Sequence, residues 1–449
     1  MRRHHRRTLA LALAGAVLVG VSTIPTTAAN SAGERSQSAT SLGRWLERQA
    51  VAAPVDGAGV DLARLGRLTG DATVVGLGEA AHGLAEVTRA KSRAVRYLVA
   101  QRGYRTVAWE DDWTLGLQIN DYIHGRRDDR DALVGQLSRE ARTREVADLL
   151  SWLREYNRTR RERVTFVGAE YFATRPLAYQ AVRAHVAAVA PDRLAELRPL
   201  IALLCPPDDD MGTYLDWFRR EVGDKTPYVR AAAELYDLVE SLPGRAGDRV
   251  HTLALQHARQ IRSFYTAFSL PAEQVMGYRD ARAAENVRWW QRYSRDRVVY
   301  WAAAAHVSTV AEVALTVPAY PATTFAPVGS YLERWYGQRY VTVGYTFDSG
   351  TMFRPPDQQA ELAPARPDWF EAPLAEVGRD SYFVDLSGEA PRAVRSWLDG
   401  PMLTRGVPEA GPGSTMSGGT PAQWYDALVH IQRVTASTPL TAVRPLPPG

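Results

Sequence analysis

Short apolar runs recur along the chain, separated by longer segments in which apolar residues repeat with helical spacing. Each run is four or five residues long and contains β-branched residues, and Gly, Arg or Asp bounds most of them. Near-continuous runs of this kind are typical of strands covered on both faces, as in a parallel sheet. We therefore predict strands at Ala72–Val75, Thr106–Trp109, Val164–Val167, Val298–Ala302 and Tyr340–Val343.

The segments between these strands are predicted to be helices. Leu84 to Arg102 carries its apolar residues on one stripe, and Gly103 stands where a helix commonly ends. Val146 to Tyr156 repeats this pattern. Strands that alternate with helices indicate right-handed βαβ units. The predicted fold class is therefore α/β, with a central, mainly parallel sheet flanked by helices.

A stretch from about residue 176 to residue 294 is almost wholly helical in pattern. It contains too much helix for one crossover, so we predict a large helical insertion or cap. After the last predicted strand the chain becomes irregular, with two surface loops rich in Pro, Gly and Ser at Pro355–Pro367 and Gly406–Thr420. The helical segments are Arg183–Leu204, Tyr228–Leu242, His251–Phe268 and Asp280–Ser294.

Residues 1–29 are predicted to be an export signal rather than part of the fold. Four arginines precede an apolar run from Leu9 to Val21, and Thr27-Ala28-Ala29 forms a plausible cleavage site before Asn30. The run is too short for a membrane-spanning helix, which needs about 20 residues. The pattern fits a twin-arginine signal or an ordinary secretory one. We expect residues 30–449 to be secreted or extracytoplasmic, without stable membrane insertion.

The charge balance argues against a nucleic-acid partner. The four arginines of the leader (Arg2, Arg3, Arg6 and Arg7) account for the whole excess of 54 basic over 50 acidic residues. The rest of the chain is therefore neutral in net charge, without a basic surplus for phosphates. Cys205 is the single cysteine, which excludes an intramolecular disulfide.

Candidate chemistry follows four of the predicted strands. Glu79 and His82, then Glu110, then Glu170, and finally His306 come just after successive strands. In an open α/β sheet, ligands bind beyond the carboxyl ends of the strands. Taken singly, His82 could be a loop histidine with Glu79 as a helix cap, Glu110 a solvated acid, and His306 a core residue. Together they predict a site.

Several other catalytic classes are excluded by the motifs. The chain has no Gly-x-Ser-x-Gly elbow, no phosphate-binding loop and no His-Glu-x-x-His. A histidine at a helix N-terminus is disfavoured as an imidazolium, which keeps a neutral base available near neutral pH. The histidine base and the carboxylates favour proton-transfer chemistry.

The same residues lie in segments that resemble the erythromycin esterase family. The resemblance extends over most of the chain beyond the leader, and the order of its pieces is specific although each piece is modest. The matching segments are Gly78–Gly83, Trp109–Trp113, Trp152–Asn157, Arg279-Asp280 with Ala284–Asn286, Gly329–Leu332, Tyr336–Tyr340 with Gly344, and Tyr425–His430.

The resemblance implies hydrolysis of a lactone ester in a macrolide or a related polyketide. His82 would take a proton from water, Glu79 and Glu110 would orient that water and the histidine, and His306 would stabilise charge on the lactone oxygen. No cofactor is implied; a divalent metal held by these four residues is a second choice. We assign substrate binding to Lys91, Asp112, Trp113, Glu170 and Arg279.

The chain departs from the family pattern at four positions. Ala303 stands where the family usually has the first of two histidines, Lys91 replaces an arginine, Glu170 replaces an aspartate and Ala283 replaces a methionine. Loss of one histidine leaves other functions open. The alternatives are a dehydration or cyclisation of a polyketide, a metal- or haem-binding protein without turnover, and a surface or polysaccharide-related protein with a decayed site.

Overall fold

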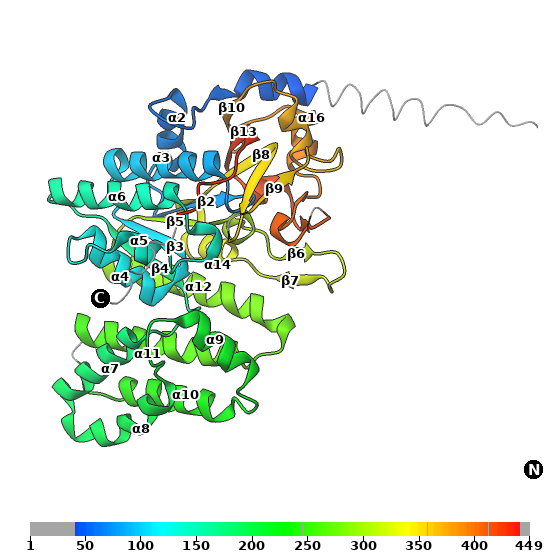
Figure 1. Cartoon of the computed structure of the whole chain (residues 1–449). Helices are drawn as coiled ribbons and strands as arrows, with labels where there is room; N and C mark the ends of the chain where they lie inside the picture. The colour runs from blue at the N-terminus through cyan, green and yellow to red at the C-terminus, as the bar shows by residue number, and fades with distance from the viewer. Residues whose placement is uncertain (1–40, 245–246, 357, 412, 441–449) are drawn as a thin grey trace, which may run out of the picture.

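The computed structural model describes residues 41–244, 247–356, 358–411 and 413–440, and the predicted export signal lies outside them (Figure 1). Within this part of the chain, nine strands form one sheet, and none of the helices is long and apolar enough to cross a membrane. Segments from the C-terminal half of the chain form a second, smaller sheet of four strands.

The centre of the large sheet is parallel, as predicted. Its strands run in the order β13–β8–β2–β5–β3–β4, and antiparallel strands β10 and β1 extend the β13 edge, while β9 pairs with β8. All five predicted strands are present, and each begins within two residues of its predicted start. Their bounds are β2 Val74–Glu79, β3 Thr106–Asp112, β4 Thr165–Glu170, β5 Val298–Ala303 and β8 Tyr340–Arg354; the others are β1 Val51–Ala52, β9 Gln358–Leu362, β10 Ser381–Asp385 and β13 Ala427–Val434.

Helices cover both faces of the sheet, which explains the near-continuous apolar strands. Alternate residues of β5 point to opposite faces, with Val299 and Trp301 in one core cluster and Val298 and Tyr300 in the other. The first face packs on α2 (Val60–Thr69), α3 (Ala85–Arg102), α4 (Trp113–Ile123) and α6 (Arg144–Thr159); the second packs on α12 (Ala272–Ser294), α13 (Ala304–Val307) and α14 (Val328–Tyr336). The fold class is the predicted one.

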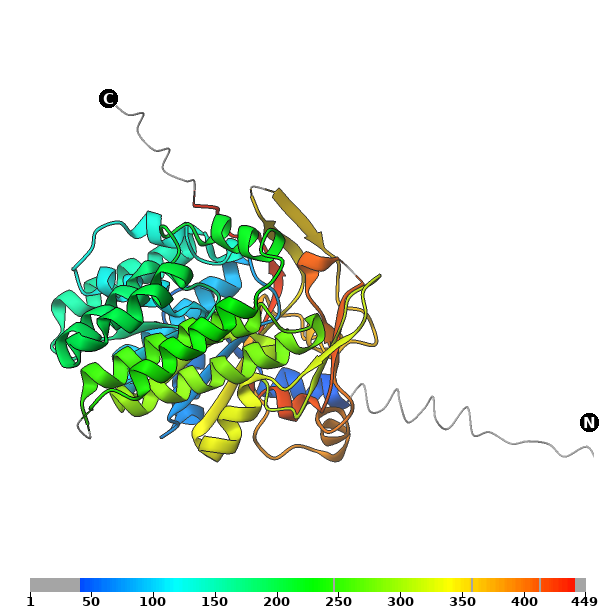
Figure 2. The same ribbon diagram turned by 90° about the horizontal axis from the view of Figure 1, so that it is seen from below.

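Between β4 and β5 the chain forms a large group of helices. Helices α7 to α11 have a hydrophobic core of their own, centred on Phe218, Phe264 and Tyr265, and form the lower block in Figure 1. In Figure 2, which views the molecule from below, the green helices of this block lie in front of the sheet. The bounds are α7 Pro176–Val189, α8 Leu194–Leu204, α9 Met211–Arg220, α10 Thr226–Glu240 and α11 Arg249–Ala267.

Two details of the sequence prediction are wrong here. The single helix expected over Arg183–Leu204 is interrupted by a 3-10 turn at Pro191–Arg193, because Pro191 has no N–H to continue an α-helix. Helix α9 had no predicted counterpart.

The C-terminal part is more regular than predicted. Strands β10 and β13 join the main sheet, and β9 lies within the segment expected to be a loop at Pro355–Pro367. Strand β12 lies within the expected Gly406–Thr420 loop and belongs to the second, antiparallel sheet, ordered β11–β12–β6–β7. Its bounds are β6 Val313–Thr316, β7 Thr323–Phe325, β11 Leu403–Arg405 and β12 Thr415–Ser417; short helices are α5 Arg130–Val134, α15 Ala372–Ala375, α16 Arg392–Leu398 and α17 Pro421–Trp424.

Candidate active site

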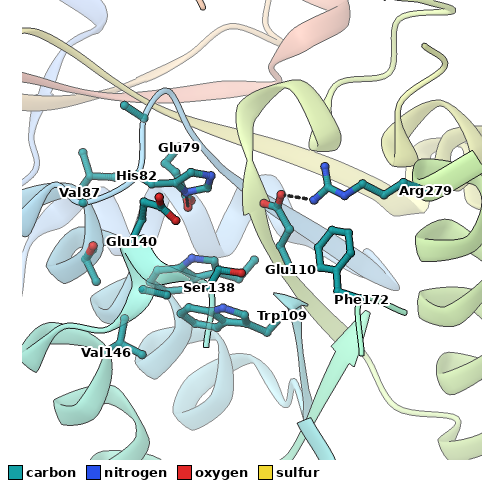
Figure 3. Close-up of a pocket in the computed structure, with 15 residues that line it drawn as sticks. Glu79, His82, Val87, Trp109, Glu110, Ser138, Glu140, Val146, Phe172 and Arg279 are labelled. Atoms are coloured by element: carbon teal, nitrogen blue, oxygen red, sulfur yellow. Dashed lines mark hydrogen bonds and ion pairs between the residues drawn. The ribbon is translucent and has the colours of Figure 1, made fainter. Parts of the chain in front are cut away.

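A cleft opens at the carboxyl ends of β2 and β3, where the sequence predicts a site. Counted out to its open mouth, it holds about 620 Å³. Figure 3 shows His82 and Glu79 on one side, with Glu110 and Arg279 on the other. The lining residues are Glu79, Ala81, His82, Gly83, Val87, Thr88, Trp109, Glu110, Ser138, Glu140, Ala141, Val146, Phe172, Arg279 and Trp301.

The turn between β2 and α3 holds a histidine–carboxylate pair. Nδ1 of His82 lies 3.1 Å from Oε1 of Glu79. A proton on Nδ1 that is donated to the carboxylate places the imidazole lone pair on Nε2, the nitrogen that acts as a base. The turn requires Gly83, because its φ is 69° and a Cβ there would lie 2.6 Å from the Phe353 carbonyl oxygen. The His82 side chain is 36% exposed, so solvent and substrate reach it.

Lys91 lies behind this pair rather than in the cleft. Its side chain is fully buried, its Nζ is in direct contact with Oε2 of Glu79, and it donates to the Ala302 carbonyl at 3.1 Å. The ammonium also lies 4.2 Å from the centre of the Trp301 ring, which stacks on Trp109 at 4.4 Å. Burial lowers the pKa of Lys91 well below its usual value, although the charge of Glu110 opposes that shift. Lys91 therefore holds the Glu79 side chain in place from its buried side.

Arg279 connects the acidic and imidazole groups of the opposite wall. It donates from Nη2 to Oε1 of Glu110 at 2.5 Å and from Nη1 to Nε2 of His306 at 2.6 Å. The other oxygen of Glu110 accepts from the Ala303 backbone N–H at 2.6 Å. Burial alone would raise the pKa of Glu110, but His306 and His82 in their protonated forms and the Arg279 guanidinium outweigh it and hold that pKa far below its usual value. Glu110 is therefore a carboxylate at neutral pH.

A second histidine–carboxylate pair lies behind Arg279. Nδ1 of His306 lies 2.8 Å from Oδ2 of Asp280, which also accepts from the Val328 N–H at 3.1 Å. Because Arg279 donates to Nε2, that nitrogen carries the lone pair, and the ring proton sits on Nδ1. We did not predict Asp280 from the sequence; its position directly beside Arg279, 26 residues before His306, was the available signal.

Glu170 is buried on the far side of Arg279 and does not line the cleft. Its Oε1 lies 3.2 Å from Nη2 of Arg279, and the residue is 1% exposed. Burial raises its pKa to about 7; Arg279 opposes this shift, and Glu110 and Asp280 reinforce it. Glu170 thus exchanges a proton near neutral pH, next to the guanidinium that faces the cleft.

Besides Lys91 and Glu170, two more residues that we assigned to substrate binding lie outside the cleft lining. Asp112 caps α4, accepting from the Leu115 N–H at 2.8 Å, and also holds Arg175 and the Ala173 N–H. These bonds fix the segment that carries Phe172 into the cleft. Trp113 is 1% exposed and packs against Trp289 and Trp290. Both positions indicate structural support rather than contact with substrate.

The sequence did not reveal the wall formed by residues 138–141. A 3-10 turn at Arg139–Ala141 brings Ser138 and Glu140 to the cleft, and the buried carboxylate of Asp111 holds it by accepting the Ser138 N–H at 2.6 Å. The buried Asp111 carboxylate therefore positions this wall of the cleft.

The cluster does not suit a divalent metal. A guanidinium already lies between Glu110 and His306, and its fixed charge would repel a cation at that point. Among the described residues, no group of three or more His, Cys, Asp or Glu side chains is arranged to hold a metal ion.

The fold and the site together define an α/β protein with two histidine–carboxylate pairs at the strand ends, a class equipped for proton transfer. The family model described as erythromycin esterase matches residues 99–434, so the chain belongs to the erythromycin esterase family.

Individual relatives cover the chain unequally. The Escherichia coli protein described as erythromycin esterase type II is 33% identical over 110 residues, which are 24% of this chain and 26% of that protein. The match thus spans about a quarter of that relative.

Solved structures agree over nearly the whole fold. A Bacillus cereus protein has a TM-score of 0.77 at 25% identity, covering 89% of this chain and 99% of its own. A structure described as a succinoglycan biosynthesis protein has a TM-score of 0.73 at 21% identity, covering 90% and 99%. A mutant of the erythromycin esterase EreC in an open conformation has a TM-score of 0.64 at 16% identity, covering 87% and 99%.

Proposed function

We propose that this protein is an ester hydrolase that opens the lactone of a macrolide or a related polyketide. The observation that supports this most directly is the His82–Glu79 pair at the mouth of the cleft, with Nδ1 of the histidine 3.1 Å from the carboxylate. This contact leaves Nε2 as the basic nitrogen, and Arg279 provides a cation across the same cleft.

The proposed reaction uses water as the nucleophile. Nε2 of His82 takes a proton from water as the oxygen bonds to the ester carbonyl carbon, and Glu79 stabilises the imidazolium that forms. The guanidinium of Arg279, held by Glu110 and His306, stabilises the negative charge on the carbonyl oxygen. The carbon–alkoxide bond then breaks, and His82 returns its proton to the leaving oxygen. The products are an acid and an alcohol, and no covalent enzyme intermediate or cofactor is required.

The shape and lining of the cleft suit a neutral, partly apolar substrate. Two stacked indoles, Trp109 and Trp301, lie beside the polar groups, and Phe172 faces Arg279 with its ring centre 5.1 Å from the guanidinium carbon. Small-molecule sites typically combine such apolar walls with a few precisely placed polar groups.

Mass spectrometry of a panel of macrolide and polyether lactones incubated with the purified chain tests this proposal. We expect the wild-type chain to add one water to a lactone. The rate of this reaction should be about 10²- to 10⁴-fold lower in His82→Ala. His124→Gln, a substitution at the residue that follows α4 and lies outside the cleft, is the matched control. If no compound in the panel changes in mass, the proposal of a hydrolase is wrong.

The position of Ala303 supports one alternative. Its side chain is a methyl group where the family usually has a histidine, and only its backbone N–H serves Glu110. An enzyme that retains a base but lacks this histidine could remove a proton from the substrate itself, giving dehydration or cyclisation. Loss of water from the substrate, or rearrangement without change in mass, would support this alternative in the same experiment.

We also propose that the chain is exported and cleaved before Asn30. The arginine-rich start, the short apolar run and the Thr27-Ala28-Ala29 segment support this. Sequencing the N-terminus of protein recovered outside the cytoplasm tests it; an intact Met1 would contradict cleavage.

A further inference from the structure

A groove between the helical block and helices α12 and α14 lies apart from the active-site cleft. About 540 Å³ of space within it is open to water-sized molecules. Among the described residues, none lines both this groove and the cleft. The lining residues are Tyr236 of α10, Thr252, Arg259 and Arg262 of α11, Glu285, Arg288, Trp289, Arg292 and Tyr293 of α12, and Trp335 of α14.

The groove concentrates positive charge on a chain whose charges balance beyond the leader. Four arginines line it, two on α11 and two on α12, and none of them forms an ion pair with a carboxylate of the described residues. Glu285, the acid in the lining, instead pairs with Arg282 at 2.6 Å. Exposed arginines on other helices pair with acids one turn away, as Arg158 does with Glu155 at 2.7 Å. The positive charge of the groove is therefore uncompensated.

Aromatic side chains hold two of the guanidinium groups in place. The guanidinium carbon of Arg262 lies 3.7 Å from the centre of the Tyr236 ring, and that of Arg288 lies 4.3 Å from the centre of the Trp335 ring. A cation–π contact restricts a guanidinium without using its N–H donors. Both groups can therefore donate pairs of hydrogen bonds to a phosphate or a carboxylate.

The two rows of arginines are fixed relative to each other. Gln256 and Gln260 of α11 both donate to the buried Oδ1 of Asn286 on α12, at 2.9 and 2.7 Å. Arg288 and Arg292 lie one turn apart on α12, which is about 5–6 Å along the helix axis. A ligand with two acidic groups can therefore contact two or more guanidinium groups at once.

We infer that this groove is a second binding site, which takes a small organic anion with at least two phosphate or carboxylate groups. Arginine binds both kinds of group through paired hydrogen bonds, so the chemistry that the groove recognises is that of a polyvalent anion. A monovalent anion leaves most of the positive charge uncompensated and should bind weakly. The inference does not depend on the hydrolase, because none of these residues acts in the proposed reaction.

Titration of the purified chain with polyvalent and monovalent anions tests this inference. Inorganic pyrophosphate and citrate are the polyvalent probes and acetate is the monovalent probe, each measured by isothermal titration calorimetry at low salt. We expect pyrophosphate or citrate to bind about tenfold or more tightly than acetate, with an affinity that falls as sodium chloride is added. Binding of pyrophosphate alone would identify a phosphate ligand, and binding of citrate alone a carboxylate ligand.

Two substitutions locate the binding within the groove. Arg262→Gln and Arg288→Gln each remove one guanidinium from a different helix, and we expect each to weaken binding of the polyvalent anion by about tenfold. Arg183→Gln removes the same charge from an exposed position of α7 and is the matched control, with unchanged affinity expected.

The two groove variants are independent, so a loss of affinity in either one supports the site if the other does not fold. The inference is wrong if neither polyvalent anion binds, or if acetate binds as tightly as they do. It is also wrong if the groove variants bind the polyvalent anion as tightly as Arg183→Gln does, because the anion then binds elsewhere.

Discussion

Nη1 of Arg279 lies 2.6 Å from Nε2 of His306, so the basic nitrogen of this histidine faces a guanidinium rather than the cleft. The resemblance implied that His306 itself stabilises charge on the lactone oxygen. The geometry supports a different division of labour, in which His306 and Glu110 orient Arg279, and Arg279 faces the substrate. In the proposed reaction His82 is then the base, and the two histidines have separate roles.

Removal of the charge on Glu79 should slow turnover without a large change in KM. Glu79→Gln keeps the shape of the side chain but loses the charge that stabilises the His82 imidazolium, and we expect kcat to fall about 10²-fold. Steady-state kinetics on the lactone measures this. Glu155→Gln makes the same change on the exposed face of α6 and serves as control. Equal kcat values for Glu79→Gln and the wild type would contradict the role of Glu79.

Asp280→Asn should loosen the His306 ring that orients Arg279. An amide is a weaker acceptor than a carboxylate for the Nδ1 proton, so the ring is held less firmly, while Arg279 still donates to Nε2. We expect kcat to fall by about tenfold or more. The nitrogen-15 shift of Nδ1 in the His306 ring reports the strength of this hydrogen bond. Unchanged shifts together with reduced activity would show that Asp280 acts in another way.

The free energy of unfolding should fall as the pH rises toward neutrality, because Glu170 then loses its proton. Burial raises its pKa from 4.5 to about 7, so the folded protein binds the proton more tightly than the unfolded chain. The resulting stabilisation is complete below about pH 4.5 and is lost as the pH rises through about 7. While Glu170 titrates, the slope is about 1.4 kcal/mol per pH unit.

Glu170→Gln removes this titrating group. Urea unfolding of the variant between pH 5 and 8 should show a weaker decline in the free energy of unfolding than the wild type does. Parallel pH profiles for the two proteins would mean that Glu170 does not titrate in this range.

Substitution of Trp113 should affect stability and leave KM unchanged. Its side chain is 1% exposed and packs against Trp289 and Trp290 behind the sheet. Trp113→Phe reduces this packing, and we expect the free energy of unfolding to fall by about 1–3 kcal/mol. Thermal unfolding and steady-state kinetics measure the two quantities. A several-fold rise in KM with unchanged stability would return Trp113 to the substrate site.

The sequence predicted the parallel strands and the residues at their ends, because both depend on local patterns. A buried strand such as β5 is apolar throughout, and His306 follows it directly. The small sheet was missed since β6, β7, β11 and β12 are three or four residues long, too short for a periodicity to show.

Pairing between distant residues could not be predicted from one sequence. In the sequence, Asp280 is one polar residue within a helix, and only the folded structure shows it next to His306. We assigned Lys91 to substrate binding, but it is fully buried against Glu79 and Trp301. We assigned substrate binding to Asp112 and Trp113 because they lie near Glu110 in the sequence. Of these three side chains, only that of Glu110 lines the cleft.

The separate core of helices α7 to α11 has a consequence for how this protein can evolve. Phe218, Phe264 and Tyr265 pack with one another and not with the sheet that carries Glu79 and Glu110. Substitutions within this core can therefore reshape the helical block without changing the packing of the sheet's own core. A lineage could remodel that block to recruit new ligands or neighbours while its acid–base machinery stays in register.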